Sequence, residues 1–413
     1  MGKRPAEPGG GSGASLLPVA EAQARLLTLA EPRPAETVGL HAATGRWLAE
    51  PLAALRTQPW TALSAMDGYA VRWADMPGPW RLVGAVQAGA LPPETSLEPG
   101  TALRIFTGAP MPPGADTVVL QEDVTAQDGL IRLTGDGPGA AGRHVRAQGS
   151  DFAAGKALLE AGVRLAAPQI ALAALAGHGT LTVRARPRVA ILSTGDELVQ
   201  PGAPCPPGKL PASNGLMLRA MAENAGAIIA SEQIVGDDLG AIAAATQAAR
   251  GADVLVTSGG ASVGDHDLVR PALEAAGGAI DFWRIAMRPG KPLIVGRLGD
   301  TIFLGLPGNP VSAMVTGALF LLPLLRRLAG AAAPLPTPRT LPLGAAMPPV
   351  GKRAEFVRAR LHDGHVSPLA FQDSAAMHAA ALADALIHRP AGSPAAREGD
   401  MVELLDRCAL GLG

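Results

Sequence analysis

The sequence predicts a multidomain chain that combines α/β and all-β parts. Its 413 residues are enough for several domains. Strand and helix signals alternate between residues 183 and 330, which is typical of a doubly wound α/β domain. Short alternating runs broken by Gly and Pro occur both before and after this part. We therefore predict a central doubly wound α/β domain, an inserted small β module, an N-terminal helical segment and a C-terminal β-barrel-like domain.

The N-terminal part is predicted to be helical after a short tail. Residues 1–14 contain no apolar core, so a flexible tail is expected there and not a signal peptide. Residues 16–30 carry apolar side chains at helical spacing, and Pro18 suits a first helical turn. A second short helix is predicted at 37–50, and Pro168 opens another. These segments are assigned to one N-terminal helical or linking domain, residues 15–50 and 150–182.

Residues 51–149 form the predicted inserted β module. Two of its segments, SAMDGYAVR from residue 64 and TGAPMPPGADTVVLQED from residue 107, are rich in polar and turn residues. By themselves, Asp67 before Gly68 indicates a turn, and Thr107 indicates a turn cap. The strands of the module are expected at WRLVGAV, ALRIFTG, DTVVLQED and LIRLTG.

The α/β domain is assigned to residues 183–330. Asn309 is a good N-cap and Pro310 a good first residue for a long apolar helix. The apolar part of that helix, 311–325, falls short of the about 20 residues that a membrane span needs, so no membrane is expected. Strands are predicted at RVAILS, AIIASEQIV, DVLVTSGG and IDFWRIAM, and further helices at 214–224, 239–250 and 267–276.

The C-terminal domain is assigned to residues 331–413. Residues 331–349 are rich in Pro and Ala and are predicted to form a linker. Period-two alternation follows in EFVRARL, HVSPLAF, ALIHRP and MVELL, which predicts a small β-barrel or sandwich.

Composition and charge exclude several classes of partner. A net charge of −1 and an aromatic content of 3% disfavour nucleic acid. The two cysteines, Cys205 and Cys408, form no CxxC or Cys/His cluster, so neither a zinc site nor a disulfide framework is expected. Cysteine usage of this kind fits a reducing compartment, and we expect a soluble cytoplasmic protein.

One glycine-rich stretch, DVLVTSGGASVGDHD from Asp253 to Asp267, has the features of a phosphate site. A buried strand leads into Gly259 and Gly260, whose backbone N–H groups can form a concave anion-accepting turn before a helix start. Asp265 and Asp267 follow, and carboxylates beside phosphate are typical of Mg²⁺ sites. A strand-to-helix connection without a ligand explains the stretch equally well when it is taken alone.

Carboxylates also follow the neighbouring strands. Glu197 comes after RVAILSTGD, and Asp237 and Asp238 come after the EQIVG strand. Together with Asp267 they would form a negative site of hard oxygen ligands at one edge of the sheet, which favours Mg²⁺. The alternative is that they are separate helix caps.

Two cations, Arg288 and Lys291, flank a Pro-Gly turn in MRPGKP. A guanidinium fork and an ammonium group pointing the same way suit an oxyanion, and solvated surface charge is the alternative. The eight histidines are scattered, and there is no Walker P-loop, GxGxxG fingerprint or Ser-His-Asp system. The chemistry is therefore expected to be metal-assisted and electrostatic, not covalent.

Taken together, these motifs resemble those of one family, the molybdopterin molybdenumtransferases of the MoeA type, related to plant molybdenum insertase and gephyrin E domains. The matching segments occur in family order and span residues 64–313. They are SAMDGYAVR, TGAPMPPGADTVVLQED, STGDEL, SNGLML, TSGGASVGDHD, MRPGKP and LPGNPVSA.

The resemblance implies the last step of molybdenum cofactor synthesis. Adenylylated molybdopterin and molybdate would react in the presence of Mg²⁺, with cleavage of the pyrophosphate bond, release of AMP and insertion of molybdenum. It also implies a homodimer whose active site is shared between protomers. Molybdopterin adenylyltransferase and recipient molybdoenzymes are further implied partners.

The resemblance also assigns roles to residues. Asp67 and Thr107 would reach the site from the partner protomer and act in catalysis together with the acids that position Mg²⁺, which are Glu197, Asp237 and Asp267. The pterin phosphate and nucleotide would be bound by Ser258, Gly259, Gly260, Ser262, Pro307 and Asn309. The molybdate pocket would consist of Arg288, Lys291, Arg353 and Ser374.

Two departures from the family pattern bear on the molybdate pocket. Arg288 stands where the family commonly has Lys, which keeps the charge but changes the geometry offered to an oxyanion. The segment around Ser374 is Ala-rich and matches in little more than Gln372 and Ser374. The sequence also leaves open whether Asp237 or Asp238 faces the site.

Two other functions are considered beside the insertase. A molybdopterin adenylyltransferase shares the α/β domain with its Gly-Gly loop, but the β module and the C-terminal domain argue against it. A gephyrin-like scaffold would leave the acidic site unexplained.

Overall fold

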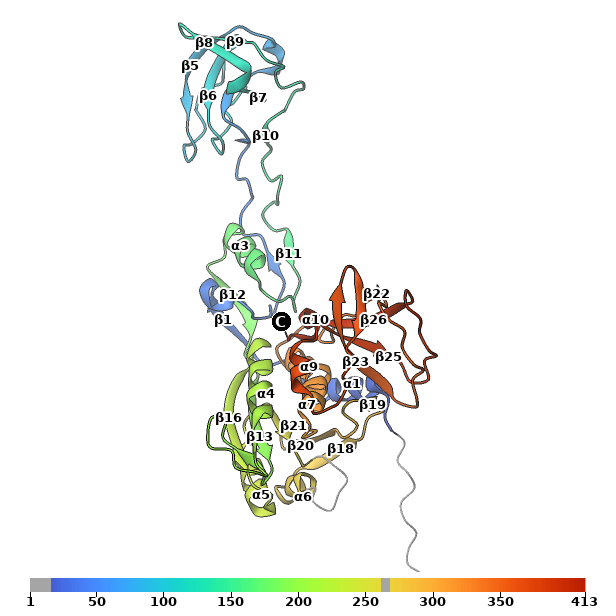
Figure 1. The fold of residues 1–413 in the computed structure, drawn as a ribbon. Coiled ribbons are helices and arrows are strands. Elements are labelled where there is room, and N and C mark those ends of the chain that lie inside the picture. The colour runs from blue at the N-terminus through green and yellow to red at the C-terminus, as the bar shows by residue number, and fades with distance from the viewer. Residues whose placement is uncertain (1–15, 261–267, 413) are drawn as a thin grey trace, which may run out of the picture.

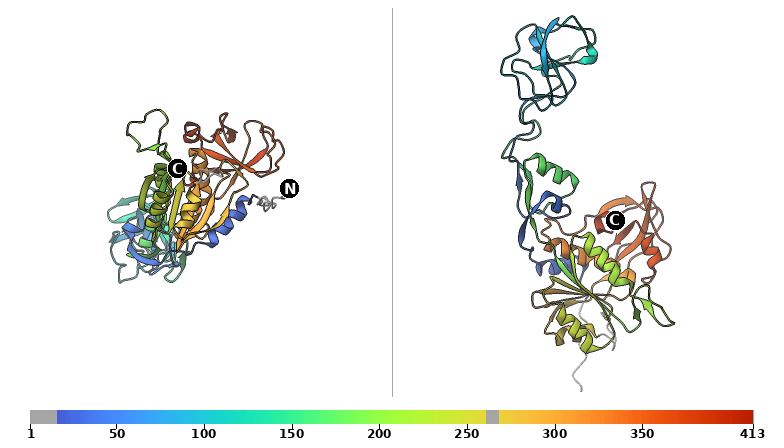
Figure 2. Two further views of the ribbon diagram at one scale, coloured as in Figure 1. Left: turned by 90° about the horizontal axis from the view of Figure 1, so that it is seen from below. Right: turned by 90° about the vertical axis from the view of Figure 1, so that its left-hand side faces the viewer.

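The computed structural model describes residues 16–260 and 268–412. Figure 1 shows an elongated molecule, with the β module at one end and the α/β and C-terminal sheets at the other. Two extended segments of chain connect the β module to the rest, as both side views show (Figures 1 and 2). The predicted tail, residues 1–14, lies outside the described residues.

A six-stranded mixed sheet forms the centre of the α/β domain. Four strands are parallel, and the last two run antiparallel to their neighbours. The residues of β17 and β21 are buried throughout, as expected for strands covered on both faces. In spatial order the strands are β16 (Ile228–Val235), β13 (Arg188–Thr194), β17 (Val254–Ser258), β21 (Thr301–Leu306), β20 (Ile294–Leu298) and β18 (Ala279–Trp283).

Helices cover both faces of this sheet, which confirms the doubly wound prediction. Successive residues of β13 alternate between two cores: Val189 and Ile191 lie in one, and Ala190 and Leu192 in the other. The first core contains side chains of α1 (Val19–Thr28), α4 (Ser213–Asn224), α7 (Pro310–Thr316), the π-helical turn η3 (Gly317–Leu321) and α8 (Leu322–Leu328). The second contains side chains of α5 (Leu239–Ala248) and α6 (Val269–Ala275).

The elements α7, η3 and α8 form one continuous helix, Pro310–Leu328. Its 19 residues are long and apolar enough to cross a membrane, and 89% of its most apolar window is buried inside the protein. The helix is longer than the predicted apolar stretch. Its apolar side chains pack in the first core of the α/β domain.

The linking region between the β module and the α/β sheet is a mixture of short ladders and helices. A helix was predicted at 37–50, and this is wrong: Thr37 and Val38 belong to a strand, and only Leu40–Ala43 is helical. Pairing with a distant strand outweighs the local helical spacing, because it buries Val38 against the core that holds Leu181. The elements are β1 (Ala35–Gly39) with β12 (Thr180–Arg184), β2 (Leu52–Ala53) with β11 (Ala157–Leu159), β3 (Leu63–Ser64) with β10 (Val145–Arg146), α2 (Leu40–Ala43) and α3 (Ala167–Leu175).

The β module is a second six-stranded sheet with its own core. Trp80 is fully buried there and packs with Val119 and Ile131. The pairing of β5 with β6 is parallel, and the other pairings are antiparallel. In spatial order the strands are β7 (Thr117–Leu120), β4 (Gly68–Val71), β6 (Thr101–Ile105), β5 (Trp80–Val86), β9 (Leu130–Leu133) and β8 (Val124–Gln127), with short helical turns η1 (Trp73–Asp75) and η2 (Gln121–Asp123).

The C-terminal sheet includes a strand from outside its own sequence segment. β19 (Met287–Arg288), which follows the α/β strand β18, pairs in parallel with β23. A bridge between Leu343 and Val366 links the two ends of the sheet, in keeping with the barrel-like prediction. The predicted linker 331–349 contains β22, which pairs with β26. The other elements are β22 (Arg339–Pro342), β23 (Ala354–His362), β24 (His365–Pro368), β25 (Ala385–Arg389), β26 (Met401–Asp406), α9 (Met377–Ala381) and α10 (Arg407–Leu410).

Candidate functional site

A polar cavity of about 730 Å³ lies at the carboxyl ends of the parallel strands. This is the position at which open α/β sheets bind ligands. Its walls come from the ends of β13, β17 and β21, from the start of α4, and from Ala375 of the C-terminal domain. The predicted site residues that line it are Glu197, Asp237, Ser258, Gly259, Gly260, Pro307 and Asn309.

The two glycines after β17 are required by the geometry of the loop. Gly259 has a φ of +103° and Gly260 a φ of +61°, conformations that L side chains rarely adopt. A Cβ on Gly259 would lie 2.4 Å from the carbonyl oxygen of Thr194, and a Cβ on Gly260 would lie 2.5 Å from Val269 Cγ2. The backbone can therefore approach the neighbouring strand and the helix closely only because both positions are glycine.

The rest of the predicted phosphate cradle cannot be placed. Ser262 and Asp267 fall in residues 261–267, outside the described part of the chain, as do Asp265 and His266. The described part of the cradle consists of Ser258, Gly259 and Gly260.

Asn214 holds two loops of the cavity together. Its Nδ2 donates to Ser258 Oγ at 2.8 Å and to the Gly308 carbonyl oxygen at 2.7 Å. One amide at the start of α4 thus fixes the loops after β17 and β21. Sequence reasoning did not select this residue. The available signal was SNGLML, in which Asn beside a helix start also fits an ordinary cap.

The two acidic loops are joined by a reciprocal pair of hydrogen bonds. The Asp237 backbone N donates to Asp196 Oδ1 at 2.9 Å, and the Asp196 backbone N donates to Asp237 Oδ2 at 3.3 Å. Lys209 Nζ donates to the Asp196 carbonyl oxygen at 2.6 Å. Asp238 has a different role, because its Oδ1 accepts from Ala241 N at 2.7 Å and caps α5. The structure therefore places Asp237 in the cavity wall and Asp238 in a helix cap.

The donors of the cavity have the chemistry that a hard cation prefers. Glu197 and Asp237 contribute exposed carboxylate oxygens. Within residues 16–260 and 268–412, no group of three or more His, Cys, Asp or Glu side chains is arranged to hold a metal ion. The third expected ligand, Asp267, lies outside these ranges.

The predicted cations lie beside the cavity and not in its wall. Arg288 is 66% exposed, and its Nη1 is 3.7 Å from Glu355 Oε1, a surface pairing of small energetic value. Lys291 is exposed and directly precedes Pro292, which lines the cavity. Arg353 precedes β23, whose first residue pairs with the residue before Arg288. Arg288 therefore lies on the strand next to β23, and Arg353 lies one residue before β23 begins.

Ser374 reaches the rim of the cavity from the C-terminal domain. Its hydroxyl accepts a hydrogen bond from Asn309 Nδ2 at 3.0 Å, and its carbonyl oxygen accepts one from the Val311 backbone N at 3.1 Å. Its neighbour Ala375 lines the cavity. These contacts join the C-terminal domain to the start of α7.

Asp67 and Thr107 are directly bonded to each other on the β module. The backbone N and the hydroxyl of Thr107 lie 2.7 and 2.8 Å from Asp67 Oδ1. These bonds, the backbone one first, lower the pKa of the Asp67 carboxyl. Asp67 precedes β4 and Thr107 follows β6, so both belong to the module that stands apart from the α/β sheet (Figure 1). Within one protomer they do not reach the cavity.

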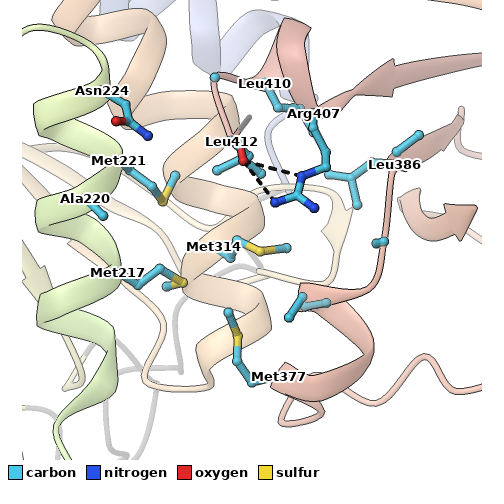
Figure 3. Close-up of a pocket in the computed structure, with 15 residues that line it drawn as sticks. Met217, Ala220, Met221, Asn224, Met314, Met377, Leu386, Arg407, Leu410 and Leu412 are labelled. Atoms are coloured by element: carbon cyan, nitrogen blue, oxygen red, sulfur yellow. Dashed lines mark hydrogen bonds between the residues drawn. The ribbon is translucent and has the colours of Figure 1, made fainter. Parts of the chain in front are cut away.

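A second cavity, of about 210 Å³, has the opposite character (Figure 3). It lies between α4, α7 and the C-terminal domain, and Met217, Met221, Met314 and Met377 line it. Arg407 is its charged lining residue, and this guanidinium donates to the Leu412 carbonyl oxygen at 3.3 and 3.4 Å. A cavity of this composition does not suit a charged ligand, so the polar cavity is the candidate site.

Three family models match consecutive parts of the chain. Residues 17–177 match the MoeA N-terminal region (domain I and II). Residues 190–327 match a probable molybdopterin binding domain. Residues 340–406 match the MoeA C-terminal region (domain IV).

Known proteins resemble the chain over most of its length. It is 41% identical over 309 residues to a molybdopterin molybdenumtransferase of Nostoc sp., covering 72% of this chain and 70% of the relative. It is 38% identical over 363 residues to molybdopterin molybdenumtransferase 2 of Mycobacterium tuberculosis, covering 84% and 89%. The solved structure of a molybdopterin biosynthesis MoeA protein from Pyrococcus horikosii superposes with a TM-score of 0.76 at 30% identity, covering 95% of this chain and 99% of that one.

Proposed function

The chain belongs to the MoeA family of molybdopterin molybdenumtransferases, and on this basis we propose which reaction it catalyses and with which residues. It is a transferase of molybdenum cofactor biosynthesis. In the proposed reaction, adenylylated molybdopterin and molybdate are the substrates, molybdenum is inserted into the pterin, and AMP is released.

The observation that carries this proposal is the polar cavity with its glycine loop. The tight glycine loop at Gly259 and Gly260 leaves room in the cavity wall next to exposed carboxylates, and the phosphates are proposed to bind there. Ser258, Pro307 and Asn309 complete the wall that would hold the phosphates and the nucleotide, and Asn214 keeps the loops in place. Ser262, which lies outside the described residues, is proposed to bind the same phosphates.

Glu197 and Asp237 are proposed to hold Mg²⁺, with Asp267 as a third ligand. Their oxygens are the donors that Mg²⁺ prefers. Bound there, the ion would neutralise the charge that develops on the pyrophosphate as its bond breaks. Asp196 would keep Asp237 at the position required, through the paired hydrogen bonds between their loops.

Molybdate is proposed to bind where the α/β and C-terminal domains meet. Arg288 and Lys291 would supply positive charge from one side of this junction, and from the other Arg353 would supply positive charge and Ser374 a hydroxyl. Support comes from the parallel pairing of β19 with β23 and from the contact between Asn309 and Ser374.

A homodimer is proposed, in which Asp67 and Thr107 complete the partner's site. Support comes from the position of the β module, which presents this bonded pair at a distance from its own cavity (Figure 1). Molybdopterin adenylyltransferase and recipient molybdoenzymes are proposed as transient partners. A cytoplasmic location is proposed because Cys205 and Cys408 are both exposed and free, which suits a reducing compartment.

The test is a turnover assay with purified protein, adenylylated molybdopterin, molybdate and Mg²⁺. AMP release should depend on molybdate and on Mg²⁺. Binding of the pterin nucleotide without AMP release would overturn the proposal. Formation of pyrophosphate from ATP and molybdopterin would instead identify an adenylyltransferase.

A further inference from the structure

Arg358 is a buried cation in the C-terminal sheet. It lies on β23, and only 2% of its surface is exposed. Burial lowers the pKa of its guanidinium, and the charge of Asp373 opposes that shift. A buried charge is tolerated only when its donors are hydrogen-bonded. The acceptors that Arg358 binds must therefore keep their positions.

Among the described residues, the hydrogen-bond partners of its guanidinium all belong to one loop, residues 372–376. Arg358 Nη2 donates to the Asp373 carbonyl oxygen at 2.9 Å, and Nη1 donates to the Ala376 carbonyl oxygen at 3.2 Å. The Arg358 backbone N and Nε donate to Gln372 Oε1 at 3.1 and 3.4 Å. Gln372 Nε2 returns a bond to the Arg358 carbonyl oxygen at 2.8 Å. These hydrogen bonds fix both ends of the loop, Gln372 and Ala376, to Arg358.

The other side of this loop faces the cavity. Between the two residues whose carbonyls Arg358 holds lie Ser374, which is bonded to Asn309 and Val311, and Ala375, which lines the cavity. A shift of Ser374 would therefore break bonds to a buried cation, and loss of the cation would release Ser374.

We propose that Arg358 is a positioning residue for the oxyanion end of the cavity: by fixing the 372–376 loop it holds Ser374 where molybdate binds, without touching the anion itself. This inference rests on the proposed function. It assigns to Arg358 an effect on molybdate affinity that is much larger than any effect on binding of the pterin nucleotide, which Ser374 can influence only through its bond with Asn309.

The chain offers a matched control in Arg389. It lies on β25, next to β23, and is 4% exposed. Its Nη2 donates to the carbonyl oxygens of Pro394 and Pro348, which do not line the cavity. Arg358→Met and Arg389→Met therefore each remove a buried guanidinium that holds loop carbonyls in the same domain. Arg358→Lys keeps the charge but loses the fork.

The experiment measures AMP release while molybdate and the pterin nucleotide are varied separately, together with the thermal midpoint of each variant. Arg358→Met should raise the half-saturating molybdate concentration by about tenfold or more, the usual effect of losing a support behind a binding group. The half-saturating pterin nucleotide concentration should stay within about twofold of wild type. Arg358→Lys should have a half-saturating molybdate concentration between those of wild type and Arg358→Met. Arg389→Met should lower the thermal midpoint without changing the half-saturating molybdate concentration. Equal effects of Arg358→Met and Arg389→Met on molybdate would overturn the inference.

Amide hydrogen exchange separates this inference from the proposed function. In Arg358→Met, exchange at Ser374 and Ala375 should speed up relative to Arg389→Met. Unchanged exchange would show that Arg358 does not hold the loop. If wild type released no AMP, the proposed function would fail and with it the link to molybdate, whatever the exchange rates.

Discussion

Thr107 directs both of its hydrogen-bond donors to a single oxygen, Oδ1 of Asp67. These bonds hold the pKa of the carboxyl below its ordinary value of 3.8. A carboxyl with a depressed pKa contributes stability that is present above its unfolded pKa and is lost as the pH falls through the folded pKa. Asp67 is therefore expected to remain charged throughout the neutral and mildly acidic range.

Replacing Thr107 by Val should raise the pKa of Asp67 part of the way back to its ordinary value. Val removes the hydroxyl but keeps the backbone N–H, which is the larger cause of the shift. An NMR titration of the Asp67 carboxyl measures this directly. Thr125→Val, on the exposed strand β8 of the same module, is the control and should leave the Asp67 titration unchanged.

Mixing two inactive variants should restore activity if the site is shared between protomers. Asp67→Ala removes a group on the β module, and Glu197→Ala removes one in the cavity. Each should slow turnover without unfolding the protein. After subunit exchange, half of the dimers are mixed and each mixed dimer has one intact site, so about a quarter of wild-type activity is expected.

The control for this mixture is a pair of variants whose substitutions both lie on the β module. Asp67→Ala with Thr107→Ala should give no recovery, because no dimer then has an intact site. A result in which Asp67→Ala and Glu197→Ala also fail to complement, although they form mixed dimers, would place both residues in one protomer's site.

Asp237 and Asp238 should respond differently to the same substitution. Asp237→Ala should raise the Mg²⁺ concentration needed for half-maximal AMP release, because a cavity carboxylate is lost. Asp238→Ala removes the cap of α5, so it should lower the free energy of unfolding by about 1 kcal/mol and leave the Mg²⁺ requirement unchanged. Mg²⁺ titrations and urea unfolding of both variants measure the difference. The reverse pattern would exchange the two assignments.

Gly259→Ala should destabilise the protein more than an alanine at an open glycine. The left-handed backbone alone costs a non-glycine residue about 1–2 kcal/mol. At Gly259 the added Cβ would also meet the carbonyl oxygen of Thr194. Gly299, with a φ of +62° and no atom within 4 Å of an added Cβ, carries the first cost alone. Equal losses for Gly259→Ala and Gly299→Ala in urea unfolding would show that the loop relaxes around the new side chain.

The position of the site could be predicted because it depends on strand order and strand ends. Strand-forming runs at β13, β16 and β17 are plain in the sequence, and parallel strands must bring their carboxyl ends to one edge, whereas β20 and β21 were not predicted. Glu197, Asp237 and Ser258 therefore line one cavity, although 61 residues separate Glu197 from Ser258 in the numbering. The pattern of strand-forming runs and the rule for parallel sheets were sufficient to predict where the site lies.

The missed features depend on contacts between distant segments. The strand at Thr37 and Val38 forms because β12 pairs with it, and the helical spacing around it carries no sign of that partner. Asn214 resembles a helix cap until the two loops it bridges are in place. Alternation puts Arg358 on the same face as the buried Phe356, but only the folded 372–376 loop satisfies its donors.

Because β19 follows a strand of the α/β domain but pairs with a strand of the C-terminal sheet, the two domains are expected to unfold as one cooperative unit. A chain cut before residue 331 would leave the residues of β19 without their partner strand, and in the separated C-terminal sheet the first two residues of β23, Ala354 and Glu355, would lose their pairing on that side, while β24 would still cover the far end of the strand. The two domains also share a core, in which Phe356 and Leu386 pack with side chains of the α/β domain, whereas the cores of the β module contain only its own residues. Calorimetry should accordingly resolve one transition for the joined domains and a separate one for the module.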